Sequence, residues 1–127
     1  MAIAHVTLAT RDVRRSSQFF VATLGWRPLD RPGNIPFPAA WLEIVPGQEL
    51  HLVEVRDFEP SPFEREYGRH VAISNPREGL AGLKERLRQH GAELVPPMRE
   101  TPSERFFFRS PDGYLFEVVA EATGEDP

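Results

Sequence analysis

Hydrophobic and polar residues alternate along residues 3–9, a pattern that predicts a half-buried β-strand. Apolar residues at helical spacing follow, from Asp12, a suitable N-cap, to about Leu24, and Gly25 would end this helix. Turn-forming segments with Pro and Gly then separate three short apolar runs, which predict strands at residues 26–30, 39–45 and 49–55. The first half of the chain therefore has the element order βαβββ.

The same order returns after residues 57–68, a segment with two prolines that we interpret as a linker. Residues 69–74 alternate as a strand, and Asn75 and Pro76 are suited to begin a helix that His90 would end. Three further apolar runs predict strands at residues 92–97, 104–110 and 114–120. The second half is also βαβββ.

The two halves repeat in register, which indicates duplication of one supersecondary unit. His70 follows His5 by 65 residues, and Glu117 follows His51 by 66 residues. We therefore predict an α+β fold in which two tandem βαβββ modules build one domain over residues 1–127. The modules are residues 1–56 and 68–122.

The composition limits the classes of function. With 127 residues, 40% of them hydrophobic and 27% charged, the chain suits one soluble globular domain. A net charge of −4 without a basic stripe argues against nucleic acid as a partner. The absence of cysteine excludes disulfides, thiolate zinc sites and cysteine nucleophiles. No apolar stretch suits a membrane span or a signal peptide, so we expect a cytoplasmic protein with no membrane partner.

Four residues that can bind metals stand in the first and last predicted strands of each half: His5, His51, His70 and Glu117. Taken singly, each histidine has an ordinary explanation as a strand residue, and Glu117 as an edge-strand residue that faces water. A pseudo-twofold relating the halves would superpose His5 on His70 and His51 on Glu117, so that all four converge on one axis. Imidazole and carboxylate ligands suit Zn, Ni, Fe, Mn or Co. The pattern predicts one divalent metal ion and leaves its identity open.

Residues 4–26, 49–55, 68–75 and 106–118 resemble segments of a known family, the vicinal oxygen chelate superfamily. That superfamily includes glyoxalase I, extradiol dioxygenases, fosfomycin-resistance thiol transferases and bleomycin resistance proteins. The resemblance implies a glyoxalase-like fold, in which a cup-shaped mixed sheet surrounds a metal-binding cleft, and it favours a homodimer. It also implies which residues are the metal ligands: His5, His51, His70 and Glu117.

Two positions depart from the pattern of that superfamily. Ser110 stands where many relatives have the Asp that opens a turn, a change that a turn position tolerates. His51 stands where glyoxalases and epimerases usually have Glu or Gln, which serve as metal ligand and as proton-transfer base. We therefore assign catalytic roles to His51 and Glu117, and leave open whether His51 binds the metal or acts as a base beside it.

Several other side chains are candidates for binding a small-molecule substrate. Four arginines could anchor an anionic group, although each is more simply explained as solvated surface: Arg69, Arg99, Arg105 and Arg109. Three aromatic side chains could line a pocket: Phe37, Trp41 and Phe107. Small residues beside the histidines would leave space for the substrate: Thr7, Ala9, Ala72 and Ser74.

The leading hypothesis for function is a metal-dependent lyase or isomerase that resembles glyoxalase I and acts by metal chelation and proton transfer. A first alternative is a dioxygenase or a fosfomycin-type thiol transferase that uses His5, His70 and Glu117 as a metal-binding triad. A second alternative is a metal-free protein that binds a drug or metabolite, as bleomycin resistance proteins do. The retention of all four candidate ligands weighs against this last alternative.

Overall fold

The computed structural model describes residues 1–121, and the chain divides into two compact units, Met1–Glu59 and Pro60–Pro127. We call these units the N-terminal half and the C-terminal half. The N-terminal half contains β1 (His5–Thr10), α1 (Val13–Leu24), β2 (Arg27–Leu29), β3 (Ala39–Val45) and β4 (Gln48–Glu54). Its four strands form one sheet in the order β1-β4-β3-β2, in which β1 and β4 are parallel and the other neighbours antiparallel.

The C-terminal half repeats this order of elements. It contains β5 (Val71–Asn75), a short 3-10 helix η1 (Arg77–Gly79), α2 (Leu80–Gln89), β6 (Glu93–Val95), β7 (Arg105–Arg109) and β8 (Leu115–Ala120). Its sheet has the order β5-β8-β7-β6, again with one parallel pair, β5 and β8. The predicted α+β fold of two βαβββ modules is confirmed.

The predicted ends of the first helix are confirmed. The side chain of Asp12 accepts a hydrogen bond from the backbone N–H of Arg15 at 3.0 Å, which satisfies one of the unpaired donors at the helix start. Gly25 has φ of +72°, a left-handed conformation that glycine adopts without steric cost, and its N–H reaches the carbonyl of Val21.

The predicted start of the second helix is wrong by several residues. Asn75 ends β5, and Pro76 has an extended backbone with φ −52° and ψ 136°. The turn of η1 therefore comes between Pro76 and α2, which begins at Leu80. The strand predicted at residues 69–74 also begins later in the structure. It is β5, which starts at Val71, directly after His70.

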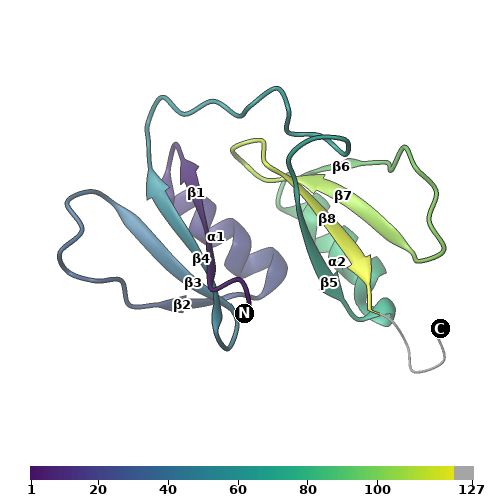
Figure 1. Ribbon diagram of the computed structural model, residues 1–127, viewed down its shortest axis with the longest axis horizontal. Coiled ribbons are helices and arrows are strands. Elements are labelled where there is room, and N and C mark those ends of the chain that lie inside the picture. Colours follow the sequence, from purple (N-terminus) through teal and green to yellow (C-terminus); the bar gives the residue numbers. More distant parts are fainter. Residues whose placement is uncertain (122–127) are drawn as a thin grey trace. The chain divides into compact units, whose positions relative to one another are not determined.

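One face of each sheet packs against the helix of the same half (Figure 1). In the N-terminal half this face consists of buried leucines: Leu8, Leu42, Leu50 and Leu52. In the C-terminal half it carries Phe106, Phe108, Phe116 and Val118, while α2 contributes Leu80, Leu83 and Leu87. Because strand side chains alternate, His51 and Glu117 lie on the opposite face of their sheets. Within residues 1–121 no helix has the length and apolar character that a membrane span requires.

Candidate functional site

His51 is the centre of a stack of rings across three strands of the N-terminal sheet. Its imidazole lies between the ring of His5 on β1, with centroids 4.1 Å apart, and the indole of Trp41 on β3, with centroids 3.9 Å apart. The strand register explains the contact with Trp41, which is the direct neighbour of His51 on β3. On β1 the direct neighbour of His51 is Thr7, and His5 lies two residues earlier on the same face. The stack covers the faces of the imidazole and leaves its nitrogens at the edge.

One of these nitrogens has a carboxylate partner. His51 Nε2 lies 2.8 Å from Oε1 of Glu49, two residues earlier on the same face of β4. A carboxylate only accepts hydrogen bonds, so in the neutral imidazole Nε2 carries the hydrogen and Nδ1 keeps the lone pair. The arrangement supplies a nitrogen base whose tautomer is set by Glu49.

The C-terminal half brings the other two expected ligands together. His70 Nε2 lies 3.2 Å from Oε1 of Glu117, and both side chains are mostly shielded, being 22% and 13% exposed. Glu117 shares its face of β8 with two cross-strand neighbours, Ala72 on β5 and Phe107 on β7. The ring of Phe107 meets the His70 ring edge to face, with centroids 5.4 Å apart.

The geometry of this pair fits a divalent metal ion. Two ligand atoms that each lie about 2.1 Å from a metal are about 3.0–3.4 Å apart in octahedral or tetrahedral coordination. The 3.2 Å between His70 Nε2 and Glu117 Oε1 falls in this range. His70 Nδ1 is buried and has no hydrogen-bond partner among the described residues. Each half supplies two of the four expected ligands. Within residues 1–121, no three or more His, Cys, Asp or Glu side chains lie together in a group that could hold a metal ion.

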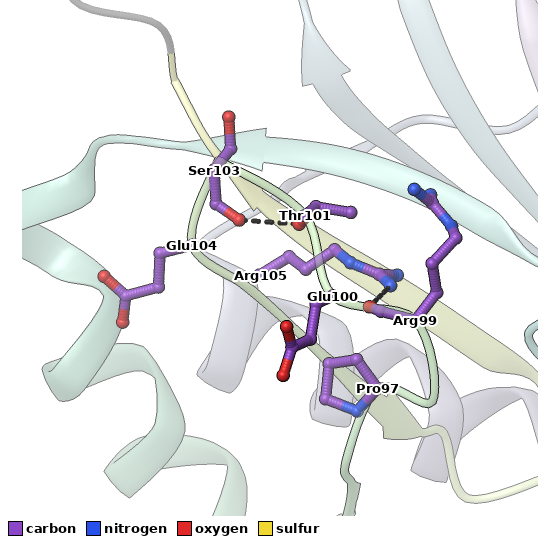
Figure 2. Close-up of a pocket in the computed structure, with 7 residues that line it drawn as sticks. All are labelled: Pro97, Arg99, Glu100, Thr101, Ser103, Glu104 and Arg105. Atoms are coloured by element: carbon purple, nitrogen blue, oxygen red, sulfur yellow. Dashed lines mark hydrogen bonds between the residues drawn. The ribbon is translucent and has the colours of Figure 1, made fainter.

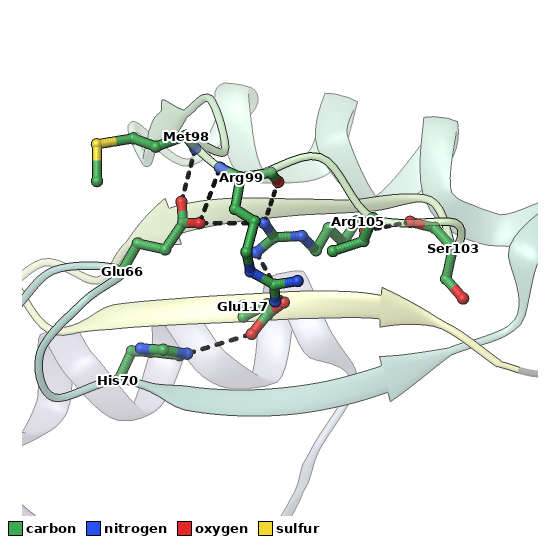
Figure 3. Close-up of polar contacts among 8 residues, drawn as sticks. Glu66, His70, Met98, Arg99, Ser103, Arg105 and Glu117 are labelled. Atoms are coloured by element: carbon green, nitrogen blue, oxygen red, sulfur yellow. Dashed lines mark hydrogen bonds and ion pairs between the residues drawn. The ribbon is translucent and has the colours of Figure 1, made fainter.

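Glu117 is also held from its other side (Figure 3). Its Oε2 accepts a hydrogen bond of 3.1 Å from the guanidinium of Arg105, which also donates to Oε2 of Glu66 at 3.1 Å. Glu66 in turn accepts hydrogen bonds from the backbone N–H groups of Met98 and Arg99, at 2.7 and 3.1 Å. The hydrogen bond from Met98, together with those from Arg105 and Arg99, outweighs burial and holds the pKa of Glu66 below its ordinary value.

The remaining candidate side chains have different surroundings. Trp41 and Phe107 lie against His51 and His70, whereas Phe37 is 44% exposed in the connection before β3. Arg69 pairs with the buried carboxylate of Glu64 at 2.9 Å and lies over the ring of Tyr114. Arg109 donates to the carbonyls of Glu64 and Gly113.

A hollow of about 390 Å³ lies in the connection between β6 and β7 (Figure 2). Two of the candidate arginines, Arg99 and Arg105, line it together with Pro97, Glu100, Thr101, Ser103 and Glu104. Its volume is within the range of small-ligand pockets, and Arg105 links it to Glu117 through one hydrogen bond.

Comparison with known proteins decides the family. Residues 2–118 match the model of the Glyoxalase/Bleomycin resistance protein/Dioxygenase superfamily. The chain belongs to this superfamily. The resemblance inferred from the sequence is therefore confirmed, and the βαβββ repeat is the superfamily fold in this chain.

Two curated relatives differ in activity. The chain is 27% identical over 121 residues to Glyoxylase I 4 of Arabidopsis thaliana, which covers 92% of this chain and 69% of that protein. It is 28% identical over 118 residues to the manganese-dependent 2,3-dihydroxybiphenyl 1,2-dioxygenase of Geobacillus genomosp. 3. The second match covers 90% of this chain and 35% of the dioxygenase, so the chain spans about a third of that protein.

Solved structures show the same fold. A Glu-to-Gln mutant of the fosfomycin resistance protein FosX from Listeria monocytogenes, complexed with Mn(II) and 1S,2S-dihydroxypropylphosphonic acid, matches with a TM-score of 0.81 at 20% identity. This match covers 95% of this chain and 92% of that one. A glyoxylase/bleomycin resistance protein/dioxygenase domain from Frankia sp. EAN1pec matches with a TM-score of 0.77 at 25% identity. The latter match covers 96% of this chain and 98% of that one.

Sequence reasoning did not single out three of the carboxylates that surround these residues. Glu49 had a detectable signal, because it stands two residues before His51 and must share its strand face. Glu64 and Glu66 fall in the segment that we interpreted as a linker, and nothing local in the sequence marks them as partners of Arg69 and Arg105. This segment contributes buried charge to the C-terminal half.

Proposed function

We propose that this protein is a metal-dependent enzyme of the vicinal oxygen chelate superfamily, a lyase or isomerase that resembles glyoxalase I and acts on a small oxygenated substrate. The ion is held by two residues from each half: His5, His51, His70 and Glu117. The observation that carries this proposal is the pair of His70 Nε2 and Glu117 Oε1, 3.2 Å apart on the face of the sheet that α2 does not cover. The repeat places His5 and His51 at the equivalent positions.

When bound, a divalent ion supplies a Lewis acid that polarises substrate oxygens and stabilises negative charge on them. Histidine and carboxylate ligands must lose their protons to bind a metal, so His70 would give up the Nε2 hydrogen that it shares with Glu117. Glu117 would contribute the anionic ligand. Phe107 and Trp41, which pack on the two histidines, would restrict the access of water to them.

His51 is the residue suited to move a proton. Its Nε2–H donates a hydrogen bond to Glu49, so the lone pair on Nδ1 is the one that can accept a proton from substrate or bind the ion. A base held by a carboxylate in one tautomer is an arrangement that general-base catalysis commonly uses. Trp41 and His5 hold the ring in its plane.

The Glu49 contact is equally compatible with a second candidate function, because it leaves Nδ1 of His51 able to act as a base. If His51 is a base and not a ligand, the ion is held by His5, His70 and Glu117, a two-histidine, one-carboxylate triad of the kind used by non-haem oxygenases. A manganese-dependent dioxygenase among the relatives is consistent with this chemistry. In that case the protein is a dioxygenase or a fosfomycin-type transferase.

Thermal unfolding with and without metal tests the site. We expect a chelator to lower the melting temperature and Mn²⁺ to restore it, because an ion at a hundredfold excess over Kd stabilises the folded state by about 2.7 kcal/mol. Glu117→Gln should abolish most of this response, while Arg99→Ala should keep it. A melt that no metal changes would contradict the proposal and favour a metal-free binding protein.

Two assays on the metal-loaded protein separate the reactions. Isomerisation of a hemithioacetal would support the lyase or isomerase, and oxygen uptake with catechols would support the dioxygenase. A protein that binds metal and is inactive in both assays would point away from both chemistries.

A further inference from the structure

Arg105 is a buried cation on the same face as Glu117. Its side chain is 4% exposed, and both of its terminal nitrogens donate to protein groups, one to Glu117 Oε2 and the other to Glu66 Oε2, each at 3.1 Å. The second nitrogen also donates to the carbonyl oxygen of Arg99. The guanidinium lies over the ring of Phe107, 5.2 Å from its centroid. The sequence-based explanation of Arg105 as solvated surface is therefore wrong.

The charge of Arg105 is fixed by its partners. Burial alone would lower the pKa of the guanidinium, but the hydrogen bonds and charges of Glu66 and Glu117 outweigh burial and raise that pKa above its usual value. A buried charge is costly unless it is paired and hydrogen-bonded, and here one cation meets two carboxylates. The terminal nitrogens that would hold an anionic substrate are already used within the protein.

Glu66 holds Arg105 on the side away from Glu117. Its two oxygens accept the backbone N–H groups of Met98 and Arg99, in the connection that follows β6. Arg105 begins β7 at the other end of the same connection. Glu66 therefore fixes both the connection and the guanidinium, so Arg105 has little freedom to turn away from Glu117 (Figure 3).

The two oxygens of Glu117 are consequently unequal. Arg105 holds Oε2, while Oε1 lies beside His70 Nε2. We infer that Arg105 is a positioning residue that retains Oε2 of Glu117, so that Glu117 binds the ion through Oε1 alone, next to His70. This inference rests on the proposed metal-dependent function. Partners that orient metal ligands in this way typically contribute about 10–100-fold to metal affinity.

Titration calorimetry with Mn²⁺ on chelator-treated protein tests the inference. We expect Arg105→Gln to weaken Mn²⁺ binding by about 10–100-fold, because Glu117 loses the partner that orients it. Arg109→Gln is the matched control, since Arg109 lies on the same strand and face but donates to the carbonyls of Glu64 and Gly113. Its Mn²⁺ affinity should stay close to that of the unchanged protein.

A second variant covers the case in which Arg105→Gln does not fold. Arg105→Lys keeps the buried charge but lacks the planar fork that reaches two carboxylates, so its affinity should fall while the protein still folds. The carboxylate stretching bands in the infrared give a readout that a purely structural role would not move. Addition of Mn²⁺ should produce the wide band separation of a one-oxygen ligand in the unchanged protein and a narrower separation in the Arg105 variants. Glu117→Gln identifies the bands.

The outcomes distinguish this inference from the proposed function. If the unchanged protein binds Mn²⁺ and the Arg105 variants bind it equally well or more tightly, the positioning role is refuted while the metal site stands. Equal losses in the Arg105 and Arg109 variants would also refute it, because they would reflect general destabilisation. If the unchanged protein binds no metal, the proposed function fails, and this inference fails with it.

Discussion

At the scale of single residues, His51 has surroundings that none of the other candidate ligands shares. Trp41 and His5 cover its ring faces, and Glu49 occupies Nε2. This leaves Nδ1 for chemistry, and Nδ1 can either bind the ion or accept a proton, but not both at once. The role of His51 thus decides between a four-ligand site and a three-ligand site with a separate base.

Replacement of His51 by alanine separates these two roles. If His51 is a ligand, His51→Ala should lose metal affinity steeply, and turnover should fall with it. If His51 is a base, the protein should keep about one ion per site, while proton transfer falls by about 10²–10⁴-fold. Metal content by elemental analysis and steady-state kinetics on the same sample give the answer. Full metal occupancy in His51→Ala would refute the four-ligand assignment.

Some residues of the candidate site can be identified from local sequence patterns, whereas others cannot, because their surroundings depend on long-range contacts. His5 and His70 are detectable because duplication conserves their spacing, and strand alternation puts Glu49 beside His51. Arg105 resembles the other arginines in sequence, because its burial depends on the register of β7 against β8 and on Glu66, which is 39 residues away along the chain. Such long-range pairing leaves no local pattern.

At the scale of elements, local signals were reliable where a residue caps a helix directly. Asp12 and Gly25 mark the start and the end of α1 as predicted, because each satisfies backbone groups within its own turn. Asn75 and Pro76 misled the prediction for α2, because Asn75 is needed as the last residue of β5, and its carbonyl accepts the N–H of Glu121. Strand pairing here overrides the local preference for a helix start.

The N-cap of α1 gives an element-scale prediction. Asp12→Ala removes the acceptor of the Arg15 N–H and should lower the free energy of unfolding by about 0.5–2 kcal/mol. Urea unfolding followed by circular dichroism measures this change. Asp30→Ala, at an exposed position after β2, is the control and should have a much smaller effect. An Asp12→Ala protein as stable as the control would show that packing alone holds the start of α1.

At the scale of the whole molecule, the duplication divides the proposed ligands equally. Each half contributes one pair, His5 with His51 and His70 with Glu117, on the face of its sheet that the helix leaves uncovered. A single chain, or two chains related by a twofold axis, can supply both kinds of pair. From the family resemblance we expect a homodimer.

Light scattering tests the expected assembly. We expect the molar mass of a dimer at micromolar concentration, and the same mass for Glu117→Gln if the ion does not hold the chains together. The mass of a single chain, 14.4 kDa, would contradict the dimer and leave one chain to supply all four ligands.

Anomalous diffraction from crystals grown with Mn²⁺ is the most direct test of the proposed metal site, because it locates the ion without reference to activity. We expect one anomalous peak within about 2.0–2.3 Å of nitrogen atoms of His5 and His70 and of Oε1 of Glu117. Oε2 of Glu117 should remain on Arg105. The absence of a peak at these residues, or a peak coordinated by other side chains, would contradict the proposed site.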